Sequence, residues 1–389
     1  MAKGELPTRV NWDAPVEGGP LDYGFDYYFG NPWWGGGPVK AFIENRQYVG
    51  NPVLNRGQTA FVSPGWKEGE RQKTELNKAL EFLGEHHMAN TMSESDVPFF
   101  LYYSPTTPHV PWTPGTEING VPTGGVSSAG PRGDEVVQFD AIVGHLIAKL
   151  RSLGIMDNTL LIVTSDNGPH LNGDPSGNTF GHDSTGGLRG RKLDVWEGGH
   201  RVPFIAHWGG GTPDGFVIPP GLVSDEVIGL QDLMATVADL THFELPTDAA
   251  EDSESILSEL LGDKSDGRIR NALLHQAERG RGGYAVRDGE WKLILQHTPQ
   301  HIGLFATGLY NIVDDPTETT NIISQHPQIV TRMVGIVGQY REMGASARRL
   351  IGIPTPNAAE GGVVLLSMGA IHVGVFLVRQ HRRSSPRTK

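Results

Sequence analysis

Asp166 and Asn167 place a carboxylate beside an amide at the end of the apolar run TLLIVTSDNGP, residues 159–169. Carboxylate and amide oxygens are hard ligands of the kind that calcium and magnesium prefer. Two oxygens do not complete a metal site, and Asp-Asn-Gly is also a common turn signature. The pair is therefore a candidate metal ligand that needs partners from elsewhere, and an ordinary turn is the alternative.

The segment HDSTGGLRGRKLDVWEGGHRVP, residues 182–203, interleaves glycines with basic side chains. Residues 181–199 hold six glycines, and the loop adds Arg189, Arg191, Lys192, His200 and Arg201. A glycine-rich basic loop can bring backbone N–H groups and cations close to a tetrahedral oxyanion. The alternative is a solvated connection with its charges turned outward. The interleaving of glycines and cations favours an anion site.

His109 lies in the segment PTTPHVPW, where flanking prolines stiffen the loop and hold the imidazole in a fixed direction. A histidine in such a loop is often structural. A nearby metal or anion can move the pKa of an imidazole across neutral pH, so His109 is also a candidate general acid or anion ligand.

Two units of helix followed by strand are expected to position these residues. Helical spacing covers residues 70–88 and 134–153, and a continuous apolar run follows each, over residues 97–105 and 159–169. This order predicts an α/β fold with a mostly parallel sheet sandwiched by helices. In such sheets ligands bind beyond the carboxyl ends of the strands, where the candidate residues lie.

The pattern divides the chain into three parts. An apolar stretch at residues 202–208 and a helical one at 230–240 continue the layered α/β domain, which we place at residues 1–245. Residues 246–350 show a hairpin pattern and then a helical segment, which predicts a small antiparallel α+β subdomain. Residues 351–389 form a tail that matches neither pattern.

Composition limits the partners. A formal net charge of −12 and a pI near 5.7 argue against nucleic acid, which is held mainly by clustered Lys and Arg. The absence of cysteine excludes disulfides, thiolate metal sites and a cysteine nucleophile. The first 15 residues lack the apolar core of a secretory signal. The apolar run 363–378 is shorter than the ~18–20 residues that span a bilayer, so a membrane contact there is the weaker alternative.

Taken together, these segments resemble the sulfatase family, of the arylsulfatase type, in the alkaline-phosphatase-like superfamily. The matching segments cover residues 1–345 in family order: GPLDYGFDYYFG, PFFLYYSPTTPHVPW, TLLIVTSDNGP, GGLRGRKLDVWEGGHRVPFIAHWGG, AVRDGEWKLI and LYNIVDDPTET. The resemblance implies a sulfuric ester hydrolase that acts on a sulfated small molecule or glycan, exported to the periplasm or the extracellular space.

The resemblance also implies roles for individual residues. Asp166 and Asn167 would ligate Ca²⁺. His109 would contact the sulfate and protonate the leaving alcohol, and Lys192 would hold the sulfate, so these two are the expected catalytic residues. His182 would approach the substrate.

Other parts of the family pattern do not occur in this sequence. The family nucleophile is a formylglycine made from the Cys or Ser of a C/S-x-P-S-R motif, and the chain has neither a cysteine nor that motif. A calcium-binding Asp-Asp pair at the end of a first strand and a G-K-W-H-L-G segment do not occur in their family positions either. We therefore expect N-terminal strands to be missing, calcium to bind weakly, and turnover to be slow or absent. A truncated or split gene would explain the loss of one contiguous block.

Two other functions remain open from the sequence. A phosphate or phosphonate ester hydrolase of the same superfamily would use a similar cation-lined site. A sulfated-glycan binding module would hold sulfate without cleaving it. Substrate identity and oligomeric state are not encoded in any readable motif.

Overall fold

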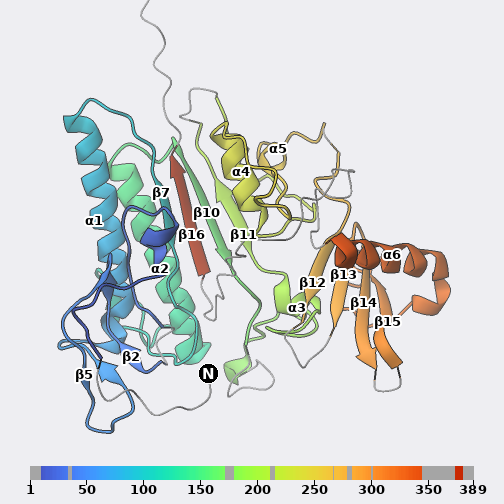
Figure 1. Ribbon diagram of the computed structural model, residues 1–389, viewed down its shortest axis with the longest axis horizontal. Helices are drawn as coiled ribbons and strands as arrows, with labels where there is room; N and C mark the ends of the chain where they lie inside the picture. The colour runs from blue at the N-terminus through green and yellow to red at the C-terminus, as the bar shows by residue number, and fades with distance from the viewer. Residues whose placement is uncertain are drawn as a thin grey trace, which may run out of the picture.

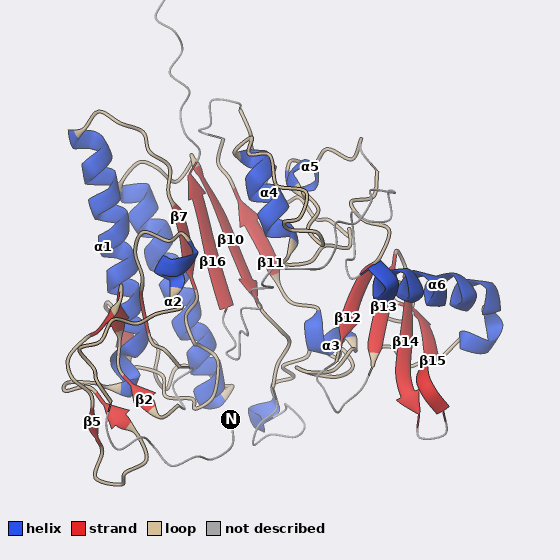
Figure 2. Ribbon diagram, in the orientation of Figure 1, coloured by secondary structure: helices blue, strands red, loops and turns tan. Residues whose placement is uncertain are grey.

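The computed structural model describes residues 10–33, 37–170, 179–210, 215–265, 267–277, 283–298, 301–343 and 373–379. Two four-stranded sheets dominate the described part of the chain (Figure 1). Helices flank the first sheet on both sides, and the second sheet lies beyond its far edge with one helix packed across it (Figure 2). The connection between the two sheets carries the candidate site.

The main sheet is antiparallel in each of its described pairings, so the predicted mostly parallel sheet is wrong for these strands. Its order is β11 (Phe204–His207), β10 (Thr159–Ser165), β16 (Val373–Arg379) and β7 (Phe100–Tyr103). β7 and β10 share one direction, as the repeated helix–strand unit predicts. β16, however, runs between them in the opposite direction. β11 runs antiparallel beside β10, and the described residues between the two strands form no helix longer than four residues.

The apolar tail contributes a strand to this sheet. Residues 373–378 of the run 363–378 belong to β16, which pairs with β10 over Thr159–Ser165 and with β7. Residues 363–372 lie outside the described part of the chain. Within that part, no helix is long and apolar enough to cross a membrane.

The side chains of β10 alternate between two cores. Leu161 packs with helices α1 (Arg71–Met92) and α2 (Gly130–Ser152) on one face. Leu160 and Ile162 point to the other face, where they meet α4 (Asp232–Leu240) and α5 (Leu257–Leu260). Period-two alternation across a sheet buried on both faces explains why the run 159–165 reads as continuously apolar.

The N-terminal part consists of short strands and turns around aromatic contacts. Trp12 lies edge-on to Tyr48 and Phe61, at 5.0 and 5.1 Å between ring centroids. The short elements there are η1 (Pro20–Tyr23), β1 (Phe29–Gly30), β2 (Val39–Lys40), β3 (Ile43–Glu44), β4 (Gln47–Tyr48), β5 (Val53–Leu54), β6 (Phe61–Val62) and η2 (Glu68–Glu70); a further short pair, β8 (Glu117–Ile118) and β9 (Val121–Pro122), follows β7. This arrangement agrees with the prediction of loops and short strands over residues 1–75.

The second sheet is the predicted antiparallel element. Its strands follow in chain order, with the helix α6 packed against them: β12 (Leu273–Gln276), β13 (Tyr284–Asp288), β14 (Trp291–Thr298), β15 (His301–Asn311) and α6 (Pro327–Met343), with η4 (Ile323–Gln325) before the helix. The hairpin predicted over residues 281–296 corresponds to β13 and β14. The division of the chain at residues 245 and 350 stays a prediction, and α5 packs on the main core.

Candidate active site

The candidate metal pair lies where the sequence places it, at the end of β10. The strand ends at Ser165, so Asp166 and Asn167 begin the turn that follows. Ser165 Oγ donates to Asn167 O at 3.1 Å, and Asn167 Nδ2 donates to Gly168 O at 2.8 Å. Because the amide nitrogen is engaged with the backbone, the amide oxygen is the atom that can face a cation. The Asp166 side chain is exposed beside it.

Glycines bring the basic loop directly against this turn. Gly168 N donates to Gly199 O at 2.9 Å, and Lys192 N donates to Pro169 O at 2.9 Å. A Cβ at Gly168 would lie 1.9 Å from Gly198 O, which no side chain tolerates. Gly168 therefore permits the backbone of the turn to touch that of the Glu-Gly-Gly segment. As a result, the Lys192 loop is fixed relative to Asp166 and Asn167.

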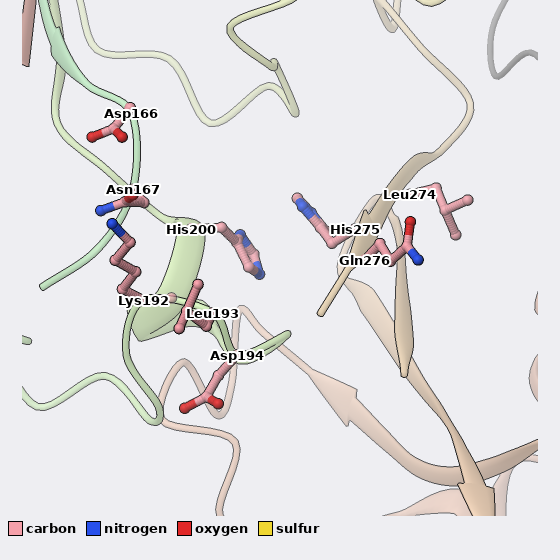
Figure 3. A pocket seen from close by; sticks show the side chains of 10 residues that line it. Asp166, Asn167, Lys192, Leu193, Asp194, His200, Leu274, His275 and Gln276 are labelled. Carbon is pink, nitrogen blue, oxygen red and sulfur yellow. The ribbon is translucent and has the colours of Figure 1, made fainter. Parts of the chain in front are cut away.

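One pocket of about 340 Å³ gathers three of the five predicted site residues, and its size is within the range of small-ligand sites. Asp166, Asn167 and Lys192 line one side, and β12 of the second sheet supplies the other (Figure 3). The remaining lining residues come from the same two regions: Leu193, Asp194, Gly199, His200, Leu274, His275 and Gln276. The pocket is thus built where the two sheets meet.

His109 does not line this pocket. Buried polar groups hold the loop that carries His109. The amide oxygen of Gln72 faces this loop and accepts from Thr106 Oγ1 at 2.7 Å and from Thr107 N at 3.2 Å. Thr107 Oγ1 in turn donates to Glu135 O at 2.5 Å. The peptide bonds before Pro108 and before Pro111 are both cis. The half-buried imidazole contacts the carbonyl of the next residue through Nδ1.

His182 also lies outside the pocket lining. It is exposed and follows η3 (Thr179–Gly181) directly. The structure therefore brings Asp166, Asn167 and Lys192 together in one pocket, which neither His109 nor His182 lines.

The other cations of the basic loop have different surroundings. The Arg189 guanidinium lies 3.5 Å from the centroid of the Trp196 ring and donates to Glu318 O at 2.8 Å, so it fastens the loop to the second sheet region. Arg201 is 3.7 Å from a Glu197 oxygen and more than half exposed. Lys192 and His200 line the pocket, whereas Arg189, Arg191 and Arg201 do not.

Two stacked histidines form part of the pocket wall: His200, from the basic loop, and His275, which the sequence pattern did not point to. The rings of His200 and His275 lie 3.7 Å apart between centroids, at an interplanar angle of 17°. Burial, reinforced by the Lys292 ammonium, lowers the pKa of His200 to about 3. Burial also holds the pKa of His275 well below its usual value. Both imidazoles are therefore neutral near pH 7, and Lys192 supplies the positive charge of the pocket wall.

The described residues do not form a complete calcium site. Asp166 and Asn167 offer at most three side-chain oxygens, whereas Ca²⁺ takes ~6–8 oxygen ligands. Within the described ranges, no group of three or more His, Cys, Asp or Glu side chains could hold a metal ion. This pair could at most supply part of a larger ligand set.

Comparison with known proteins identifies the family. The family model Sulfatase matches residues 13–243, more than half of the chain. The N-acetylgalactosamine-6-O-sulfatase of Bacteroides thetaiotaomicron is 31% identical over 337 residues, which cover 81% of this chain and 60% of that protein. The N-acetylgalactosamine-6-sulfatase of Canis lupus familiaris is 33% identical and covers 62% of this chain and 43% of that protein. The chain belongs to the sulfatase family, whose members are sulfuric ester hydrolases.

Solved structures support the same assignment. A chain from work on glycosaminoglycan metabolism by Bacteroides thetaiotaomicron superposes with a TM-score of 0.69 at 26% identity, over 85% of this chain and 75% of that one. The protein described here shares the alkaline-phosphatase-like fold of these sulfatases. It spans about 60% of the length of the first curated relative.

Proposed function

We propose that the pocket at the end of β10 binds the sulfate group of a sulfate ester, the substrate class of sulfatases. The observation that carries this proposal is the convergence of Lys192, Asp166 and Asn167 on one pocket. A fixed ammonium suits a sulfate oxygen, and the carboxylate and amide oxygens suit a cation that would share the anion. The substrate contacts that the family resemblance implies for His109 and His182 are also part of this proposal. Neither residue lines the pocket.

The proposed substrate class is a 6-sulfated N-acetylgalactosamine residue of a glycan. Two relatives at 31% and 33% identity carry that specificity in their names. The neutral pair His200 and His275 supports a sugar ligand, because flat, uncharged rings offer both an apolar face and hydrogen-bonding nitrogens. Such a substrate would place the protein in the periplasm or outside the cell.

Binding without rapid turnover is the expected behaviour of this chain. The sequence contains no cysteine and no C/S-x-P-S-R motif from which a formylglycine could form. The loss of a nucleophile commonly costs several orders of magnitude in rate. We also propose that β16 occupies a central position that a strand with an acidic pair takes in other sulfatases. Its direction, opposite to both neighbours, supports this.

Titration calorimetry with three ligands tests the function. We expect N-acetylgalactosamine 6-sulfate to bind at least about tenfold more tightly than the unsulfated sugar, equivalent to ~1.4 kcal/mol. Equal affinity for the two would contradict a sulfate site. Tighter binding of the 6-phosphate would favour the phosphate ester hydrolase instead. Sulfate release in the same samples, with calcium added, is expected to stay at the uncatalysed level, and calcium-dependent release would refute the expected impairment.

A further inference from the structure

A lysine of the second sheet is buried behind the pocket wall. Lys292 lies on β14 and is 0% exposed. Its Nζ is 2.8 Å from Glu197 Oε1, on the short helix α3 (Glu197–His200), and 3.0 Å from Glu318 Oε1. Glu318 Oε2 accepts from Glu197 N at 2.7 Å, which closes the network. A lysine from one sheet region thus anchors the helix that carries a pocket residue of the other.

The third contact of this ammonium is with a ring nitrogen. Lys292 Nζ lies 3.1 Å from His200 Nε2, and the same nitrogen lies 3.1 Å from Val195 O. An ammonium has three protons to donate and no lone pair. It can therefore bond His200 only if Nε2 is the bare nitrogen of the imidazole. The Val195 carbonyl would require the opposite tautomer, with the proton on Nε2.

The competition between these partners favours the lysine. If Nε2 carried the proton, two N–H groups would face each other, and the third proton of a fully buried ammonium would lose its acceptor. An unmet donor on a buried charged group is costly, whereas a bond from a charged donor is worth about 1.5–3 kcal/mol. The Val195 carbonyl gives only a neutral hydrogen bond in exchange. The proton of His200 thus belongs on Nδ1.

We propose that Lys292 is a positioning residue that fixes His200 as its Nδ1–H tautomer. His200 lines the pocket and stacks on His275, and in this tautomer Nδ1–H is the hydrogen-bond donor of its neutral ring. A donor there suits an oxygen of a sugar sulfate. Only this statement about the ligand rests on the proposed function, since the tautomer itself is set by Lys292 and Val195, whichever ligand binds.

Nitrogen NMR of protein labelled with ¹⁵N-histidine tests the tautomer directly. Protonated and bare ring nitrogens differ widely in chemical shift, and His200→Asn identifies the signal of His200 by its loss. We expect Nδ1–H in the unmodified protein and a switch to Nε2–H in Lys292→Met. The double variant Lys292→Met/Glu318→Gln removes one uncompensated carboxylate and gives the same readout if the single variant folds poorly. Lys40→Met, which removes a lysine that is about one-third exposed and paired with Glu68, should leave the signal unchanged.

Two outcomes would overturn the proposal. The first is an NMR result of either of two kinds: an Nε2–H signal of His200 in the unmodified protein, or a His200 tautomer that does not change in either Lys292 variant. The second is a switched tautomer with unaltered affinity for N-acetylgalactosamine 6-sulfate, since a positioning residue must affect the ligand; we expect a loss of about tenfold. If the unmodified protein binds no sulfated sugar, the proposed function fails while the NMR result still decides the tautomer.

Discussion

Replacing Lys192 by alanine is expected to weaken binding of N-acetylgalactosamine 6-sulfate by about 10-fold to 100-fold, or ~1.4–3 kcal/mol. Lys192 supplies the positive charge of the pocket wall, because its other basic residues, His200 and His275, are neutral near pH 7. The side chain is part-exposed and its backbone bond to Pro169 O survives truncation. The free energy of unfolding should therefore change by no more than about 0.5 kcal/mol. Calorimetric titration and thermal unfolding measure the two quantities.

Arg191→Ala is the matched control for this prediction. Arg191 precedes Lys192 in the same loop and carries the same charge, but it does not line the pocket. Its removal lowers the net charge equally, so any general electrostatic attraction of the anion is lost to the same extent. Equal losses of affinity in the two variants would show that charge, and not the placement of Lys192, holds the ligand.

Replacing Lys292 by methionine is expected to lower the free energy of unfolding by about 3–5 kcal/mol at pH 7. Methionine keeps most of the side-chain length but leaves two largely buried carboxylates, on Glu197 and Glu318, without their shared cation. Lys40→Met breaks an ion pair that is about one-third exposed and should cost less than about 1 kcal/mol. Denaturant unfolding of the three proteins measures the difference.

The pH dependence of the Lys292→Met variant follows from the same carboxylates. Burial raises the pKa of Glu318 even with the lysine present, and removing the lysine raises it further. A folded-state pKa above the unfolded value stabilises the fold at low pH and loses that effect as pH rises through the folded pKa. The cost of the substitution should therefore shrink as the pH falls toward the ordinary Glu pKa of about 4.3. A cost that is independent of pH would indicate lost packing and not unpaired charge.

The local sequence pattern was enough to predict the residues on one side of the pocket, Asp166, Asn167 and Lys192. The apolar run that becomes β10 ends where Asp166 begins, and the glycine-rich loop brings Lys192 back to the same strand end. The direction of the sheet could not be predicted, because strand direction depends on the pairing partner. β10 and β7 both pair with β16, which lies far from them in the sequence, at residues 373–379. The repeated helix–strand unit does correctly predict that β7 and β10 share a direction.

The second sheet's contribution to the site had no readable signal. His275 lies next to Leu273 and Leu274 in an unremarkable short strand, and its role appears only when His200 stacks on it. Lys292 alternates with apolar residues, a pattern that usually places a lysine in solvent. It is buried because a carboxylate 95 residues away folds against it. Long-range pairing of this kind leaves no mark in the local sequence.

The most direct test of the sulfate site is a crystal structure of this chain with N-acetylgalactosamine 6-sulfate, with the sulfur located by its anomalous signal. We predict the sulfur in the pocket between the end of β10 and β12, with a sulfate oxygen in hydrogen-bond contact with Lys192 Nζ and the sugar beside His200. A sulfate bound elsewhere on the protein, with this pocket empty at saturating ligand, would contradict the assignment.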